Sequence, residues 1–334
     1  MSGISIGDMA QQFTSLRNGT AIKTELFALA ESLSTEKVVD LTKSLGGETA
    51  RFSGISYSLT QLEGYAQTAS ETQQTLSNIQ TILEKVNATR NASAERLLLV
   101  SDDSTAAQIN EAAVASRGAF AEMVSALNTQ VAGRALMSGT DVRTVPLASA
   151  NDMLTDIRTE IGGAVDLPTI IATVEVWFND PAGGFAADGY LGNKGSPIIR
   201  HVSENTSVEI DARADDPAVR EVLKGAALAA LADDLPGLSQ ATKTSLLQTA
   251  SAQLYGSSSN LVAVQARVGS AESAVARALV ETNAQQTALG LAQNNLSLAD
   301  PFETASRLQA TQLQLETHFS VTARMSQLSL LRFI

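Results

Sequence analysis

Apolar residues recur at steps of three and four over two long stretches of this chain, one in each half. In the first half the repeat begins at Ile55 and has one polar member, Gln73. Its positions are Ile55, Leu59, Leu62, Ala66, Ala69, Gln73, Leu76, Ile79, Leu83 and Val86. This alternation is typical of a coiled-coil helix, whose apolar seam faces a neighbouring helix. We therefore predict a rod helix here, with Leu62 and Ile79 buried.

A second seam of the same kind follows in the second half. Its positions are Leu247, Ala250, Leu254, Ser257, Leu261, Val264, Val268, Ala271, Val275, Ala278, Thr282, Gln285, Leu289, Ala292 and Leu296. At a rise of about 1.5 Å per residue, one unbroken helix over this stretch would be about 75 Å long. We predict such a helix, with Leu261 and Val268 buried in its seam.

A third helix is predicted between the two seams. Its apolar positions are Ile109, Ala113, Phe120, Val124, Leu127 and Val131. Ser101, Asp102 and Asp103 precede it and are residue types that cap helix N-termini, so we expect the helix to begin there.

Prolines separate the helical ends of the chain from its centre. All seven lie from Pro146 onward, and five of them lie in one central stretch. Within that stretch Ile170–Phe178 (IIATVEVWF) and Val208–Ala212 (VEIDA) are predicted strands, and glycine-rich segments between them are predicted turns. We expect residues 138–214 to form a small β-containing insert that is a separable appendage. Asp216 and Pro217 should then open a helix that continues through Leu231.

The two ends of the chain read as further helices outside the seams. Gly46 and Gly47 are expected to end the N-terminal helix. Asp300, Pro301 and Glu303 supply a cap, a first-turn proline and an N3 glutamate, which together predict the start of the C-terminal helix.

The fold class that follows is mainly α. We expect an elongated coiled-coil rod formed by the N- and C-terminal segments, with a small β-containing central insert. The predicted regions are an N-terminal assembly helix (1–47), rod helices (48–137), the central insert (138–214), further rod helices (215–299) and a C-terminal assembly helix (300–334).

The stripes on the terminal helices predict an interface, because a single helix cannot bury its own apolar stripe. They should pair with each other or with another subunit. We expect the terminal helices to be poorly ordered in the free subunit and to order fully only on assembly. The residues predicted to form this assembly interface are Phe13, Leu16, Leu29, Leu33, Leu315, Phe319, Met325, Leu328 and Leu331.

Composition narrows the function further. A net charge of -12, with no dense cluster of Lys or Arg, argues against nucleic acid as a partner. Uncharged apolar runs such as Leu97–Val100 are far shorter than the roughly 20 residues that span a bilayer. Residues 1–10 have no basic segment before an apolar stretch, so no Sec-type signal is expected. The absence of cysteine excludes disulfides and thiolate chemistry.

Groups that could support catalysis or metal binding are few. The two histidines, His201 and His318, have no neighbours at metal-ligand spacing, and we expect His318 to occupy a surface or interface position. Three acidic doublets, at residues 102–103, 215–216 and 233–234, could be acid–base pairs. Two of them open predicted helices, and capping is the better explanation. We therefore predict no enzyme activity, no cofactor and no metal.

Several segments of the chain resemble the flagellin superfamily. Leu33–Val39 (LSTEKVV) is similar to the segment that follows the first helix in that family. Gly133–Thr140 (GRALMSGT) is similar to the GRYxFSGT segment of its hook–filament junction members. Residues 300–305 (DPFETA) and 329–334 (SLLRFI) resemble the final helix of the family.

The segment Ser34–Arg51 departs from the filament flagellins. It lacks their SSGLRINSAxDDAAG loop and has no Asp-Asp pair. This difference favours the junction members over the subunits that form the filament itself.

What the resemblance implies is a non-enzymatic structural subunit of the bacterial flagellum that joins hook to filament. Export would use the flagellar type III apparatus without a cleaved signal, which would place the protein outside the cell. Its partners would be flagellin, the neighbouring hook-associated protein, further copies of itself in an axial ring and an export chaperone, with no nucleic acid and no membrane. Two alternatives stay open: a filament flagellin, and a secreted coiled-coil module for binding or adhesion.

Overall fold

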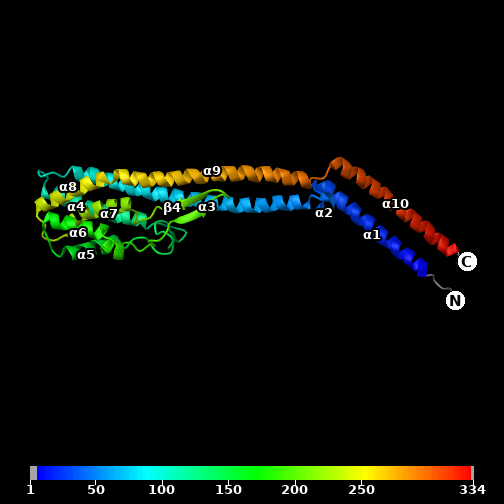
Figure 1. The fold of residues 1–334 in the computed structure, drawn as a ribbon, viewed down its shortest axis with the longest axis horizontal. Coiled ribbons are helices and arrows are strands. Elements are labelled where there is room, and N and C mark those ends of the chain that lie inside the picture. The colour runs from blue at the N-terminus through cyan, green and yellow to red at the C-terminus, as the bar shows by residue number, and fades with distance from the viewer. Residues whose placement is uncertain (1–5, 332–334) are drawn as a thin grey trace. The chain divides into compact units, whose positions relative to one another are not determined.

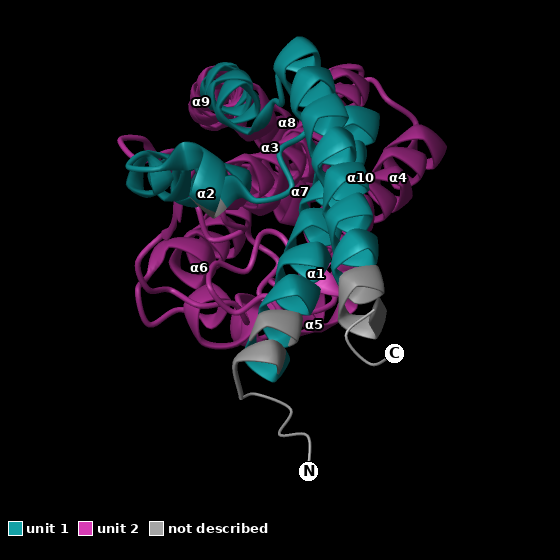
Figure 2. Cartoon of the chain, turned by 90° about the vertical axis from the view of Figure 1, so that its right-hand side faces the viewer, with its two compact units in different colours: residues 1–63, 284–334 teal, residues 64–283 magenta. Residues whose placement is uncertain are grey.

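The computed structural model describes residues 6–331, with the side chains of residues 9–325 apart from Gln11, Gln12 and Thr42. The described residues are mainly helical, as predicted, and include four short strands (Figure 1). The chain divides into two compact units, residues 1–63 with 284–334 and residues 64–283 (Figure 2). The division falls within two long helices, α3 (Thr49–Leu98) and α9 (Ser258–Ser297).

The first unit is built on helices α1 (Ile6–Thr35), α2 (Leu41–Leu45) and α10 (Pro301–Leu331). The predicted start of α10 is confirmed, because the Asp300 carboxylate accepts hydrogen bonds from the backbone N–H groups of Phe302 (2.8 Å) and Glu303 (3.2 Å). The predicted end of the first helix at Gly46 and Gly47 is wrong.

Helix α1 ends earlier, at Thr35, because the next residue leaves helical geometry. Glu36 has a positive φ of 56°. The chain then forms backbone hydrogen bonds with the residues before α10, from Val38 N–H to Ser297 O (2.9 Å) and from Ala299 N–H to Glu36 O (3.0 Å). These bonds fasten the end of α1 to the start of α10.

The second unit packs α4 (Ala106–Leu127), α7 (Pro217–Asp234) and α8 (Gln240–Gly256) with parts of α3 and α9. The predicted cap of α4 lies too early in the sequence. The cap is Thr105, whose side chain accepts from the backbone N–H of Gln108 while the Gln108 side chain accepts from the Thr105 N–H, a capping box. Asp216 caps α7 as predicted, although α7 continues to Asp234.

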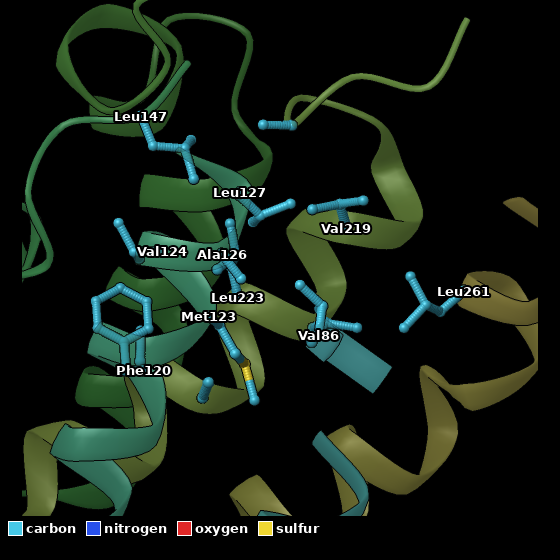
Figure 3. Close-up of a cluster of buried hydrophobic side chains, with 14 of the residues drawn as sticks. Val86, Phe120, Met123, Val124, Ala126, Leu127, Leu147, Val219, Leu223 and Leu261 are labelled. Carbon is cyan, nitrogen blue, oxygen red and sulfur yellow. The ribbon is translucent and has the colours of Figure 1, made fainter. Parts of the chain in front are cut away.

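Most of the seam positions that lie in this unit belong to its buried core (Figure 3). Ile79 and Leu261 are fully buried and Val268 is 5% exposed, so these three predictions are confirmed. Leu62, which lies in the first unit, is only half-buried. In Figure 3 Leu261 points from α9 into the cluster that contains Val86 of α3.

The second seam is not one helix as predicted, because α8 ends at Gly256 and α9 begins at Ser258. Arg90 of α3 lies at this break and is 2% exposed. Its guanidinium donates to the Leu254 carbonyl (2.6 Å) and to the Ser258 hydroxyl (3.0 Å). The Ser257 hydroxyl also donates to the Leu254 carbonyl, at 2.8 Å. Polar side chains therefore occupy a backbone acceptor of the last turn of α8.

The predicted strand Ile170–Phe178 is wrong, since these residues lie in a helix, α6 (Leu167–Asn179). The Asp166 carboxylate caps it by accepting from the Thr169 N–H (3.1 Å), and Pro168 occupies its first turn. The buried members are Ile170, Val174, Trp177 and Phe178. They follow steps of four, three and one, which place them on one face of a helix. Packing of that face outweighs the strand preference of the β-branched residues.

The other predicted strand is confirmed, because β4 (Ser207–Ile210) pairs antiparallel with β3 (Ile198–His201). A second hairpin joins β1 (Gln130–Val131) to β2 (Arg134–Ala135). The central segment also contains α5 (Ala150–Ile161) and a π-helical turn, η1 (Phe185–Gly189). It is β-containing, but most of its regular structure is helical.

The helices of the central segment share the core of the second unit. Residues of α5 and α6 belong to the same buried cluster as residues of α4 and α7. Asp234 at the end of α7 lies 3.4 Å from the guanidinium of Arg117 of α4 and 3.5 Å from that of Arg158 of α5. The acidic doublet at residues 233–234 is thus part of an ion-pair cluster. This packing is at odds with a separable appendage.

The two ends of the central segment meet at the GRALMSGT motif. Ala214 N–H donates to the Met137 carbonyl (2.9 Å), and Asn193 N–H donates to the Ser138 carbonyl (2.9 Å). Gly139 has a φ of +68°, and a Cβ there would lie 2.7 Å from the Asn193 carbonyl oxygen, so the turn requires glycine. The motif therefore joins the beginning of the central segment to its end through backbone hydrogen bonds.

Candidate assembly interface

Helices α1 and α10 pack side by side in the first unit (Figures 1 and 2). They run antiparallel, because Ser15 near the start of α1 contacts Thr322 near the end of α10, at 3.3 Å between hydroxyl oxygens. The two terminal helices thus pair with each other, one of the two arrangements that the sequence allowed. Whether the helices order fully only on assembly stays a prediction.

Small and polar side chains dominate where these two helices are most buried. Ile22 is the buried large apolar residue of α1, and it is accompanied by Gly19 and Ser32. On α10 the buried positions are Thr304 and Thr311. Burial of a threonine or serine contributes less hydrophobic free energy than burial of a leucine, so this pairing is weakly stabilised for its length.

His318 lies between the two helices, at the interface position expected for it. Its Nε2 is 3.4 Å from the Ser15 hydroxyl oxygen. Its ring packs against Gly19, where an added Cβ would come within 3.1 Å of Cε1. Its Nδ1 is buried and has no hydrogen-bond partner in the described part of the chain. Gly19 therefore gives the imidazole room to enter the helix pair.

The predicted interface residues divide into two groups. Leu29 and Leu315 are half-buried. The exposed members are Phe13, Leu16, Leu33, Phe319 and Met325, and Phe13 is 69% exposed. The side chains of Leu328 and Leu331 lie outside the described residues. Pairing of α1 with α10 thus leaves most of the described stripe accessible.

Further exposed apolar residues on these helices were not predicted. Phe27 is 70% exposed and Phe302 is 84% exposed. Leu313 and Val321 of α10 are exposed as well. Phe27 lies 11 residues after Leu16, close to three full turns, so helical spacing alone could have identified it. Phe302 was considered only as a member of the helix-start motif, and its exposure was therefore not predicted.

The helix pair has an aromatic ridge on one face and a groove, the α1–α10 groove, on another. The aromatic ridge consists of Phe13, Leu16 and Phe27 of α1 and Phe319 of α10. Lys23 belongs to the ridge face, because its ammonium group lies 5.3 Å from the centre of the Phe319 ring. The α1–α10 groove is a surface hollow whose walls come from Ala21, Ile22 and Glu25 of α1 and Leu313, Gln314 and Val321 of α10.

The described residues show no sign of two other kinds of feature, a metal site and a membrane-spanning helix. Among them, no three His, Asp or Glu side chains gather where they could hold a metal ion. None of the described helices combines the length and the apolar character needed to cross a membrane.

The fold is mainly helical, and its paired terminal helices keep exposed apolar residues that favour burial by a further protein. Residues 242–334 match the family described as the bacterial flagellin C-terminal helical region. That match includes α9 and α10 and therefore one helix of the candidate interface.

The fold is similar to that of a candidate flagellar hook-associated protein from Vibrio parahaemolyticus. The TM-score is 0.53 at 11% sequence identity, over 75% of this chain and 99% of the Vibrio chain. At this identity the likeness is one of fold. No curated protein sequence matches the chain. The resemblance to the flagellin superfamily, first inferred from short motifs, is confirmed, and a structural role in the flagellum is supported.

Proposed function

We propose that this protein is the adaptor that joins the flagellar hook to the filament. It would act outside the cell as a non-enzymatic subunit, exported without a cleaved signal. The observation that carries the proposal is the α1–α10 pair, in which Phe13, Leu16, Phe27 and Phe319 stay exposed although the two helices already cover each other. Exposed aromatic residues in such number on one small unit favour burial by a further protein.

An adaptor needs this surface for neighbours along and around the flagellar axis. The partners that we propose are flagellin on one side, the neighbouring hook-associated protein on the other and further copies of this chain in an axial ring, with an export chaperone before assembly. The absence of the Asp-Asp loop between Ser34 and Arg51 supports the junction role over the filament role. Filament flagellin remains the alternative within the same superfamily, and a coiled-coil adhesion module is the alternative outside it.

The test is deletion of the gene, with electron microscopy of the cells and measurement of flagellin in the medium. A junction adaptor predicts hooks without filaments and flagellin released into the medium. A filament flagellin predicts hooks without filaments and no release of another flagellin. An adhesion module predicts normal filaments and weaker attachment to surfaces.

A matched pair of variants connects this phenotype to the helix pair. Phe27→Asp removes an exposed aromatic side chain of α1, and we expect it to be exported normally but to fail to hold a filament. Ile199→Asp makes the same kind of change at a 60% exposed residue of β3 and is expected to keep motility. Normal swimming of the Phe27→Asp strain would refute the role of this surface.

A further inference from the structure

The aromatic ridge and the α1–α10 groove lie on opposite faces of the same helix pair. On α1, Lys23 and Glu25 are two residues apart, which is about 200° around a helix, so the ridge-face lysine and the groove glutamate point away from each other. The same spacing separates Phe27 from Glu25. On α10, Phe319 is two residues from Val321 of the groove wall. Each copy therefore carries an exposed apolar face and, on the opposite side of the helix pair, a hollow lined in part by apolar residues.

The two faces are also complementary in charge. The cation on the ridge face is Lys23, which lies over the Phe319 ring. Glu25 is the one carboxylate among the residues that line the groove. Apart from Glu25 and His318, the residues that line the groove are apolar or uncharged. Such a lining suits the entry of an aromatic side chain.

We infer that the groove of one copy receives the aromatic ridge of a second copy, with Lys23 of one chain facing Glu25 of the next. This inference rests on the proposed function, because it names the surfaces through which the subunits associate. Contact between two different faces is heterologous, so each copy in the array uses its ridge toward one neighbour and its groove toward the other. Such a contact closes into a ring or continues as a helix, whereas contact of like faces would stop at a dimer.

The inference also assigns different roles to the apolar and the charged positions of α1. Phe27 and Leu16 would supply the apolar area of the contact. Lys23 and Glu25 would set its register and exclude ridge-to-ridge contact, where two lysines would meet.

A charge exchange tests the pairing in the full-length chain. Sedimentation velocity over a range of concentrations measures self-association of the wild type, Lys23→Glu, Glu25→Lys and the double variant Lys23→Glu/Glu25→Lys. Each single variant brings like charges together and should weaken association about ten-fold. The double variant has the same composition and net charge as the wild type and should recover its association. Lys43→Glu, an exposed charge reversal on α2, should have no effect.

Cysteine cross-linking distinguishes the geometry, and the chain has no cysteine of its own to interfere. Phe27→Cys places a thiol on the ridge and Ala21→Cys places one in the groove. Under oxidation the double variant should form a ladder of dimers, trimers and larger species, while each single variant should stay monomeric. Dimers from Phe27→Cys alone would show contact between like faces and overturn the inference.

The inference is also overturned if the wild type stays monomeric at every concentration, which would leave a different axial protein as the occupant of the groove. It is equally overturned if the double variant fails to recover. These outcomes are separate from the proposed function. A strain that retains filaments with the Phe27→Cys/Ala21→Cys variant, while that purified variant shows no ladder, would contradict the ridge–groove contact alone. A deletion strain with normal filaments would contradict the junction role itself.

Discussion

The burial of Leu261 gives the sharpest quantitative prediction for the fold. Leu261 is fully buried in the core of the second unit, where Val86, Val219 and Leu223 belong to the same cluster (Figure 3). Leu261→Ala removes the packed side-chain atoms and leaves a cavity, which costs about 2–5 kcal/mol. Leu261→Asp adds an uncompensated carboxylate, a change that by itself costs about 3–5 kcal/mol. Because domains are stable by about 5–15 kcal/mol, the aspartate variant should lose most of this stability.

The assay is thermal and urea unfolding of the full-length chain, followed by circular dichroism and by fluorescence of Trp177, the one tryptophan. For a unit of this size each kcal/mol lowers Tm by about 2–4 °C, so Leu261→Ala should lower it by roughly 4–20 °C. Val262→Asp is the matched control, since Val262 is the next residue and is exposed. Equal melting of Leu261→Asp and Val262→Asp would refute the seam assignment.

Four further predictions concern other parts of the chain. Gly184→Ala would bring a Cβ within 1.9 Å of Trp177 Nε1, which donates to the Asp156 carboxylate at 2.7 Å; we expect a loss of about 1–3 kcal/mol and a shifted emission maximum. Gly118→Ala in α4 meets no atom within 4 Å and should instead stabilise by up to about 1 kcal/mol, as unfolding curves would show. Removal of residues 302–334 should leave the second unit folded by circular dichroism but abolish filament attachment, and normal swimming of that strain would contradict this. Replacement of residues 138–214 by a Gly/Ser linker should uncover the faces of α4 and α7 and broaden the unfolding transition, and an unchanged sharp transition would show that the segment is separable after all.

Periodicity along the chain was sufficient for most of the helices, because a seam with steps of three and four is a local property of the sequence. Ile79, Leu261 and Val268 were identified as buried for this reason. The start of α10 was predictable too, since an Asp cap followed by proline and glutamate acts within one turn.

Contacts between distant segments decided what periodicity could not. Ile170–Phe178 has the composition of a strand, and it becomes helical because Asp166 caps it and one face packs into the core shared with α7. At the break between α8 and α9 the buried guanidinium of Arg90 donates to the Leu254 carbonyl from more than 160 residues away in sequence, a contact that no local pattern near Ser257 reveals.

For the candidate interface, too, some features follow from local sequence and others from contacts between distant segments. The sequence by itself determined that both terminal helices carry apolar stripes and need partners, because stripes are set by residue spacing within each helix. Only the tertiary structure decided which positions of those stripes the partner helix covers, leaving Leu29 and Leu315 half-buried but Phe13 and Phe27 exposed. The reason is geometric: a helix presents its side chains all around its axis, and the line along which a second helix packs depends on the close approach of particular pairs, here Gly19 with His318.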